Sequence, residues 1–143
     1  MIRAAVFADI PRLVSMGERF IAETSYCGKL ASNAQTLAAL MHRLISHEDG
    51  TVMVSLEEGS VTGMIGAFVY EHPMSGERIA GEAFWWVEPE KRGCGVRLMK
   101  AVEAWANDRN AVRLTMIAPT DKVARLYRAC GYDKLEEHYQ KDI

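Results

Sequence analysis

The chain is poor in the residue types from which disulfide frameworks and metal sites are built. Its 143 residues include only three cysteines, Cys27, Cys94 and Cys130, an odd number without CxxC spacing. This usage argues against a disulfide framework or a zinc site and is typical of a reducing compartment. His42 and His47 would fall on different faces of a helix, so they do not suggest a ligand pair. We therefore expect a cytoplasmic protein that binds no metal.

Long apolar runs and blocks of positive charge are missing as well. No apolar stretch approaches the length of a membrane span, and residues 1–11 lack the apolar core of a secretory leader. The formal net charge is -2 without a basic block, so neither nucleic acid nor a membrane is an expected partner. The chain is long enough for one core and has no internal repeats or linkers. We therefore expect a single domain spanning residues 1–143.

The most informative stretch is residues 82–105, in which an apolar run leads into a glycine turn and then a helix. The run ends at Pro89, Gly93 and Gly95 follow, and apolar residues recur at helical spacing from about Val96. Glycines let the backbone approach a ligand, and the first turn of a helix offers unpaired N–H groups to an anion. The turn is surrounded by four cationic residues: Lys91, Arg92, Arg97 and Lys100. These features predict a pyrophosphate site.

The residues of this turn restrict which pyrophosphate ligand it suits. A nucleoside triphosphatase loop ends in Gly-Lys-Ser/Thr, but here Gly95 is followed by Val96 and Arg97. A dinucleotide fingerprint needs a third glycine where Leu98 stands. Arg92-Gly-x-Gly95, after a strand end that contains proline, resembles instead the coenzyme A loop of the GNAT superfamily of N-acetyltransferases. The chain departs from that family at Arg97, where the family has Gly or Ala.

A second segment, residues 123–132, strengthens this resemblance. Leu126, Tyr127 and Gly131 match the family's Asn-x-x-Ala-x-x-Leu-Tyr-x-x-x-Gly-Phe segment. Tyr132 replaces the phenylalanine, and Thr120 stands where the asparagine would be. Together with the glycine turn and the order of predicted elements, the resemblance covers nearly the whole chain.

The predicted elements follow from hydrophobic periodicity and from capping residues. Residues 2–6 form a short strand, Asp9 caps a first helix, and Ser32 and Gln35 form a capping box for a second helix. Further strands are predicted at 52–56, 61–70, 79–88, 112–116 and 132–140, with helices from about residue 96 and from Thr120 or Asp121. The expected fold is α/β (α+β) and GNAT-like. Its mixed, mostly antiparallel sheet has six to seven strands and is flanked by about four helices.

The resemblance implies an enzyme that uses acetyl-CoA as co-substrate. Such an N-acetyltransferase moves an acetyl group to a primary amine by direct attack in a ternary complex. A backbone N–H near the end of the fourth strand would serve the acetyl carbonyl oxygen. The residues expected to bind the cofactor are Trp86, Val87, Arg92, Gly93, Cys94, Gly95, Val96 and Arg97.

Two residues are candidates for proton transfer. The family's acid is the tyrosine of the last helix, which corresponds to Tyr127, and its base is often a carboxylate on the fourth strand, here Glu82. A carboxylate inside an apolar strand should have a raised pKa, which suits a base near neutral pH. The alternatives are that Tyr127 only packs its ring and hydrogen-bonds its hydroxyl, and that Glu82 lies at the solvent end of its strand or pairs with Arg78 or Arg113. Glu88 has the same strand parity but is expected to be structural.

The amine acceptor is not identified by the sequence, and it could be a small molecule or a peptide. Glu23 and Tyr26 are candidate substrate residues, because the resemblance places the loop between the first two helices beside the acceptor. Trp85 is a third candidate, since one of the two adjacent tryptophans is expected to face the acceptor pocket. Two other functions stay open: an acyltransferase with a different acyl donor, and a catalytically weak CoA-binding module marked by Arg97 and Thr120. The family resemblance also allows a homodimer.

Overall fold

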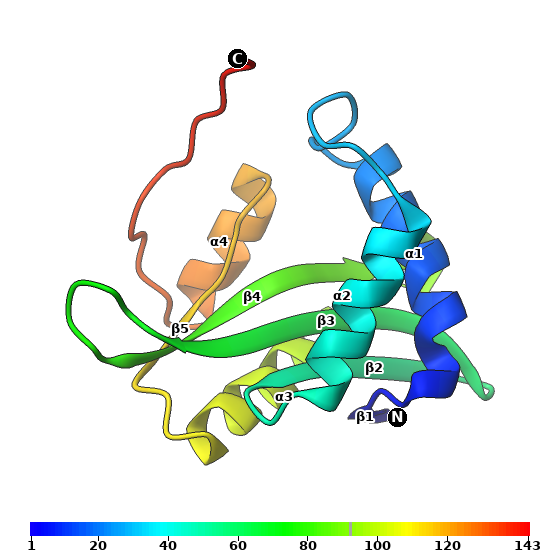
Figure 1. The fold of residues 1–143 in the computed structure, drawn as a ribbon, viewed down its shortest axis with the longest axis horizontal. Coiled ribbons are helices and arrows are strands. Elements are labelled where there is room, and N and C mark those ends of the chain that lie inside the picture. Colours follow the sequence, from blue (N-terminus) through cyan, green and yellow to red (C-terminus); the bar gives the residue numbers. More distant parts are fainter. Residues whose placement is uncertain (92) are drawn as a thin grey trace.

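A five-stranded sheet with helices on both faces forms the body of the molecule (Figure 1). The computed structural model describes residues 1–91 and 93–143. The strands are β1 (Ile2–Ala4), β2 (Gly50–Glu57), β3 (Ser60–Glu71), β4 (Arg78–Val87) and β5 (Arg113–Thr115). The α-helices of the described chain are α1 (Ile10–Glu23), α2 (Ala34–Ser46), α3 (Gly95–Asp108) and α4 (Asp121–Ala129). Short 3-10 turns lie at Phe7–Asp9 and Pro89–Lys91. None of the described helices is long and apolar enough to span a membrane.

The sheet is mixed and mostly antiparallel, as predicted. Its strands follow the order of the chain, β1 to β4 pair antiparallel, and β5 pairs parallel to β4. The β2–β3 hairpin turns at Glu58 and Gly59, both with positive φ, which is the backbone that such a two-residue turn requires. The predicted number of strands, six to seven, was too high, because the described residues form five.

The core is divided into two clusters by the sheet. On one face, Leu13 of α1 and Met41 of α2 pack against Phe84 and Trp86 of β4. On the other face, residues of α3 such as Leu98 pack against the neighbouring strands in the second cluster. The apolar run at the end of β4 is therefore covered on both faces, which is why it does not alternate with polar residues.

One side of β4 loses its strand partner halfway along. Strands β4 and β5 pair only from Ile79 to Gly81, with Thr115 as the last residue of β5. The chain then turns toward α4, whereas β4 continues to Val87. No described strand pairs with this side of β4 beyond Gly81, so residues 82–87 have an open backbone edge there.

Two predicted helix caps differ from the structure. Asp9 occupies the N-cap position of α1, as predicted, but its carboxylate accepts the Val6 N–H at 2.8 Å and pairs with Arg3, so its side chain makes no capping bond to the helix. Helix α2 is capped by Asn33, whose Oδ1 accepts the Thr36 N–H at 3.0 Å. The predicted capping box of Ser32 and Gln35 is therefore wrong, because the neighbouring asparagine takes the cap. Of the two predicted caps for α4, the structure has Thr120.

The predicted closing strand at 132–140 is also absent from the structure. Residues 133–143 have neither helix nor strand and run away from the sheet, as the red end of the ribbon shows in Figure 1. Many of these residues are charged. Glu137 pairs with Lys134 and accepts the Tyr139 hydroxyl at 2.7 Å, and Gln140 Nε2 donates to the Lys29 carbonyl oxygen in the loop between α1 and α2 at 3.0 Å. Strand β5, only three residues long, offers this segment little edge on which to pair.

Candidate functional site

Glu82 and Tyr127 meet at a single residue, Ile117. The Ile117 N–H donates to Glu82 Oε2 at 2.8 Å, and the Tyr127 hydroxyl donates to the Ile117 carbonyl oxygen at 2.8 Å. Glu82 comes from β4, Tyr127 from α4, and Ile117 from the connection after β5. The fold therefore brings the predicted base and the predicted acid together, beside the open edge of β4.

Burial gives Glu82 an unusual protonation behaviour. It raises the pKa of this carboxyl from 4.5 to about 7, although the Ile117 N–H and the Tyr127 hydroxyl act in the opposite direction. The alternative structural ion pairs are not formed. Arg78 lies 2.9 Å from Asp49, and Arg113 pairs with a glutamate in the loop before β4. A carboxyl with a pKa near 7 can take up and release a proton at neutral pH.

Tyr127 is held in place by aromatic rings on two sides. Its ring stacks on Trp85 with centroids 5.9 Å apart and lies 5.6 Å from the ring of Tyr132. The Tyr132 hydroxyl in turn donates to Glu103 Oε1 on α3 at 2.7 Å. Burial first, and then the charge of Glu82, raises the pKa of Tyr127 above its usual value, so the hydroxyl stays protonated. It is thus available as a donor.

The glycine turn leads into α3 in a conformation that only glycine adopts easily. Arg92 lies outside the described residues, but Gly93 has a φ of 131° and its backbone is exposed. Gly95 begins α3, one residue before the predicted start at about Val96, and lies against Trp85, so that a Cβ at this position would be 3.0 Å from Trp85 Cζ2. The turn thus leaves the N-terminus of α3 accessible to an anion. Gly95 also has a packing role, because a side chain there would crowd the indole of Trp85.

Two of the cations beside the turn, Lys91 and Arg97, line a hollow that Glu82 and Tyr127 do not line. This hollow, of about 330 Å³, lies toward the β2–β3 hairpin, and its lining includes Lys91, Cys94 and Arg97. The Lys91 ammonium pairs with Glu57 of the hairpin at 3.0 Å. Arg97, the residue that departs from the family pattern, therefore lies at this hollow. Among the described residues, no three His, Cys, Asp or Glu side chains are grouped so as to hold a metal ion.

The side chains of the two tryptophans of β4 lie on opposite faces of the sheet. Trp86, assigned to the cofactor, is buried on the α1–α2 face, where its ring meets Phe20 edge-on at 6.1 Å. Trp85, assigned to the acceptor, lies against Tyr127 of α4 and the start of α3. Parity along a strand separates the two side chains but does not say which face is which.

The two acceptor candidates near the end of α1 are placed differently. Glu23 accepts hydrogen bonds from Arg19 Nε at 2.5 Å and Nη2 at 3.2 Å. Tyr26 packs its ring 5.3 Å from that of Phe20. Burial first, and then the charge of Glu82, raises the pKa of Tyr26. Tyr26 is therefore electrostatically linked to the Glu82 site, whereas Glu23 is engaged by the arginine.

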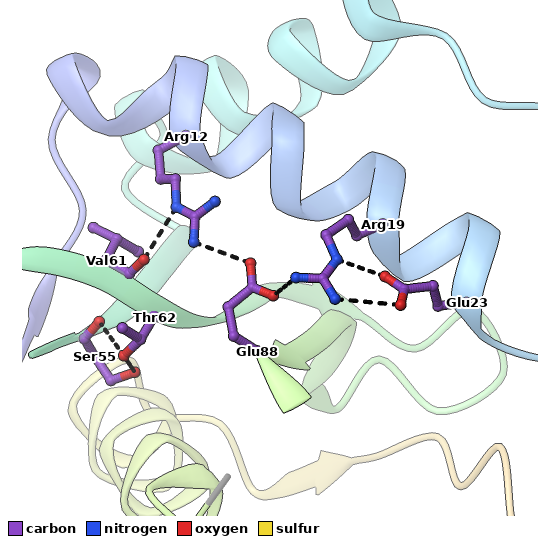
Figure 2. Close-up of polar contacts among 7 residues, drawn as sticks. All are labelled: Arg12, Arg19, Glu23, Ser55, Val61, Thr62 and Glu88. Carbon is purple, nitrogen blue, oxygen red and sulfur yellow. Dashed lines mark hydrogen bonds and ion pairs between the residues drawn. The ribbon is translucent and has the colours of Figure 1, made fainter. Parts of the chain in front are cut away.

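A group of charged residues that was not predicted lies at the end of β4 (Figure 2). Glu88 is 2% exposed and binds both Arg12 and Arg19 of α1. Its structural role was expected, but its partners were not. The signal in the sequence is weak: two arginines seven residues apart on one helix, and a carboxylate directly before a proline.

The chain has recognisable relatives in sequence and in fold. The model of the acetyltransferase (GNAT) family matches residues 19–132. No protein of curated function matches the chain significantly by sequence.

Solved structures of other proteins share the fold at low identity. One is an aminoglycoside acetyltransferase from an uncultured soil metagenomic sample in complex with sisomicin, with TM-score 0.75, 17% identity, and coverage of 100% of this chain and 95% of that chain. A ribosomal-protein-alanine N-acetyltransferase from Brucella melitensis biovar Abortus 2308 has TM-score 0.73 and 14% identity, covering 100% and 99%. A transcriptional regulator from Bacillus halodurans C-125 has TM-score 0.79 and 15% identity, covering 100% and 99%.

Proposed function

Because the chain belongs to the acetyltransferase (GNAT) family, we propose that it moves the acetyl group of acetyl-CoA to a primary amine. The amine, of a small molecule or a peptide, would attack directly in a ternary complex. The observation that carries this proposal is the meeting of Glu82 and Tyr127 at Ile117, beside the open edge of β4. One place then offers a proton acceptor, a proton donor and free backbone groups.

The glycine turn supports acetyl-CoA as the donor. The positive φ of Gly93 and the N-terminus of α3 suit a pyrophosphate, and the open edge of β4 lies next to them along the chain. Bound acetyl-CoA would supply an acetyl group already activated as a thioester. A backbone N–H near Val87 is the candidate donor to the carbonyl oxygen, where negative charge develops. The cofactor-binding residues would be Trp86 and Val87 through their backbone, Arg92, Gly93, Cys94, Gly95, Val96 and Arg97.

Glu82 is the proposed base. An ammonium ion has no lone pair, so the amine has to lose a proton before it can attack. A pKa of about 7 leaves roughly half of the Glu82 carboxyls ionised at neutral pH, which suits this transfer, directly or through water. Tyr26, whose own pKa is raised partly by Glu82, would line the approach of the amine.

Tyr127 is the proposed acid. Its raised pKa keeps the hydroxyl protonated, so it can donate a hydrogen bond and then a proton toward the departing sulfur. This role requires the hydroxyl to exchange its bond to the Ile117 carbonyl for one to the leaving group. Stacking on Trp85 keeps the ring in place during the exchange.

Two other functions have an observation in their favour. The turn would bind the pyrophosphate and not the acyl group, so a longer acyl donor fits the same residues. Arg97 and Thr120 depart from the family pattern, which would also suit a CoA-binding module with little activity.

Thermal unfolding with acetyl-CoA, CoA, ATP and NAD at equal concentrations tests the donor. A ligand at about a hundred times its dissociation constant adds roughly 2.7 kcal/mol, which raises the midpoint by several degrees. We expect a rise with acetyl-CoA and CoA and none with ATP or NAD. If acetyl-CoA produces no rise, the chain does not use this donor.

Turnover tests the transfer itself. The amine screen should include aminoglycosides and peptides that begin with alanine, since proteins of this fold are named for those acceptors. Tyr127→Phe should lower kcat by about a hundredfold or more while CoA binding is kept. Tyr139→Phe is the matched control, because that ring is exposed and its hydroxyl bonds to Glu137 rather than to the site. An unchanged kcat in Tyr127→Phe at saturating substrates would remove Tyr127 as the acid.

A further inference from the structure

The end of β4 is fastened to α1 by a buried carboxylate that the proposed chemistry does not use. Glu88 follows Val87 directly, and each of its carboxylate oxygens binds a different arginine (Figure 2). Arg12 Nη2 lies 3.0 Å from Oε1, and Arg19 Nη1 binds Oε2. A buried carboxylate whose two oxygens are both engaged by guanidinium groups is strongly held in position.

Each arginine also has a second partner. Arg12 Nε donates to the Val61 carbonyl oxygen of β3 at 3.1 Å. Arg19 holds Glu23 with two hydrogen bonds, and its guanidinium lies over the ring of Trp86 at 5.8 Å from the centroid. Two successive parts of α1 are therefore tied to the sheet, one to β3 and one to β4.

The ion pairs of Glu88 connect the two predicted binding regions, the cofactor turn and the acceptor loop between α1 and α2. Its N–H donates to the Thr62 carbonyl oxygen at 2.9 Å, which continues the β3–β4 pairing by one residue. Immediately afterwards the chain enters the turn that leads to Gly93. Arg19, which binds Glu88, also binds Glu23, the last residue of α1 before the loop expected to border the acceptor. Arg19 thus touches the residue that precedes each of these two regions.

We propose that Glu88 is a positioning residue for acetyl transfer, an inference that rests on the proposed function. Held by Arg12 and Arg19, it fixes the end of β4 relative to α1. The backbone near Val87 and the start of the cofactor turn then keep one geometry relative to Glu82, Tyr127 and the acceptor side. Misplacement of a reacting group by about 1 Å can lower a rate roughly a hundredfold, so this geometry matters for kcat.

A purely structural ion pair and a positioning residue predict different measurements. A structural pair would change the unfolding midpoint and leave the kinetics of the folded protein as they are. A positioning residue holds two binding regions relative to each other, so its loss should lower kcat while each region still binds its own ligand. CoA affinity depends on the local backbone of the turn, and we expect it to change by less than about threefold.

Glu88→Gln is the test variant, because it keeps the shape and removes the charge. CoA binding is measured by calorimetry. The kcat is measured as thiol release from acetyl-CoA, with the best amine of the screen, or with water as acceptor if no amine is turned over. We expect a midpoint lower by several degrees and a kcat lower by about tenfold to a hundredfold. Arg12→Gln is a second variant, since this partly exposed side chain can be lost with less damage to folding.

Asp9→Asn is the matched control. Asp9 is also a poorly exposed carboxylate paired with an arginine, Arg3, but it lies at the start of α1, away from the end of β4. It should lower the midpoint without lowering kcat. If Glu88→Gln and Arg12→Gln both keep the wild-type kcat, Glu88 is not a positioning residue. If the wild-type protein itself binds neither CoA nor acetyl-CoA, the proposed function fails instead.

Discussion

The raised pKa of Glu82 makes the stability of the folded protein depend on pH. Its carboxyl has a pKa of about 7 in the fold against 4.5 ordinarily, so between these pH values the folded state holds more protons than the unfolded state. The free energy of unfolding should therefore fall as pH rises from about 4.5 to 7 and stay lower above. At about 1.36 kcal/mol per unit, this loss is about 3 kcal/mol.

Glu82→Gln should remove this loss. A neutral amide needs no ionised form, so we expect the variant to be more stable than the wild type at pH 8, by up to about 3 kcal/mol, and nearly equal at pH 4.5. Urea unfolding of both proteins at the two pH values measures the difference. Equal pH dependence in the two proteins would mean that Glu82 is not buried as described.

The same carboxyl should control the rate. Only its ionised form can take a proton, so kcat/KM of the wild type should rise about tenfold per pH unit up to about pH 7 and then level. Glu82→Gln should lose about a hundredfold or more of the activity at pH 8. A pH–rate profile of the wild type is the measurement. A profile that is flat between pH 5.5 and 8 would point to another base.

Single helices and strands were the easiest features to predict. The hairpin at Glu58–Gly59, the end of β4 and the start of α3 at Gly95 all follow from local patterns, and the structure has them within a residue or two. Capping was harder, because Ser32 and Asn33 are both good cap residues and only the folded entry of the chain decides between them.

Neighbouring substitutions can test this cap. Asn33→Ala removes the acceptor of the Thr36 N–H and should destabilise the fold by about 1 kcal/mol. Ser32→Ala is the matched control and should have little effect. The two midpoints of chemical unfolding make the comparison. If Ser32→Ala proves the more costly change, the helix begins one residue earlier than described.

At the scale of the molecule, the fold could be predicted from motifs in the sequence. Contacts between residues far apart in the chain could not. Tyr127 could be selected because it lies in a family motif, and Glu82 because it is a carboxylate on the fourth strand; the structure places both against Ile117. The partners of Glu88 could not be selected, because Arg12 lies 76 residues away along the chain and no pattern links the two. The closing strand failed for a related reason: pairing depends on an edge, and β5 is too short to supply one.

Deleting residues 134–143 tests the end of the chain as the structure has it. These residues form no helix or strand and are exposed, while Tyr132, which packs on Tyr127, is kept. We expect the unfolding midpoint to stay within about 2 °C, since little buried surface is lost. A drop of ten degrees or more would show that the segment pairs with the sheet in solution.

The loop between α1 and α2 is anchored at each end by a residue that flanks it, Glu23 before the loop and Asn33 after it. Glu23 is gripped by Arg19 before the loop, and Asn33 holds the Thr36 N–H after it. Such a segment can be exchanged as a cassette, because residues 25–32 can be replaced without touching either anchor. Grafting loops of different length and charge between these anchors is therefore a practical route to new amine preferences on an unchanged donor site.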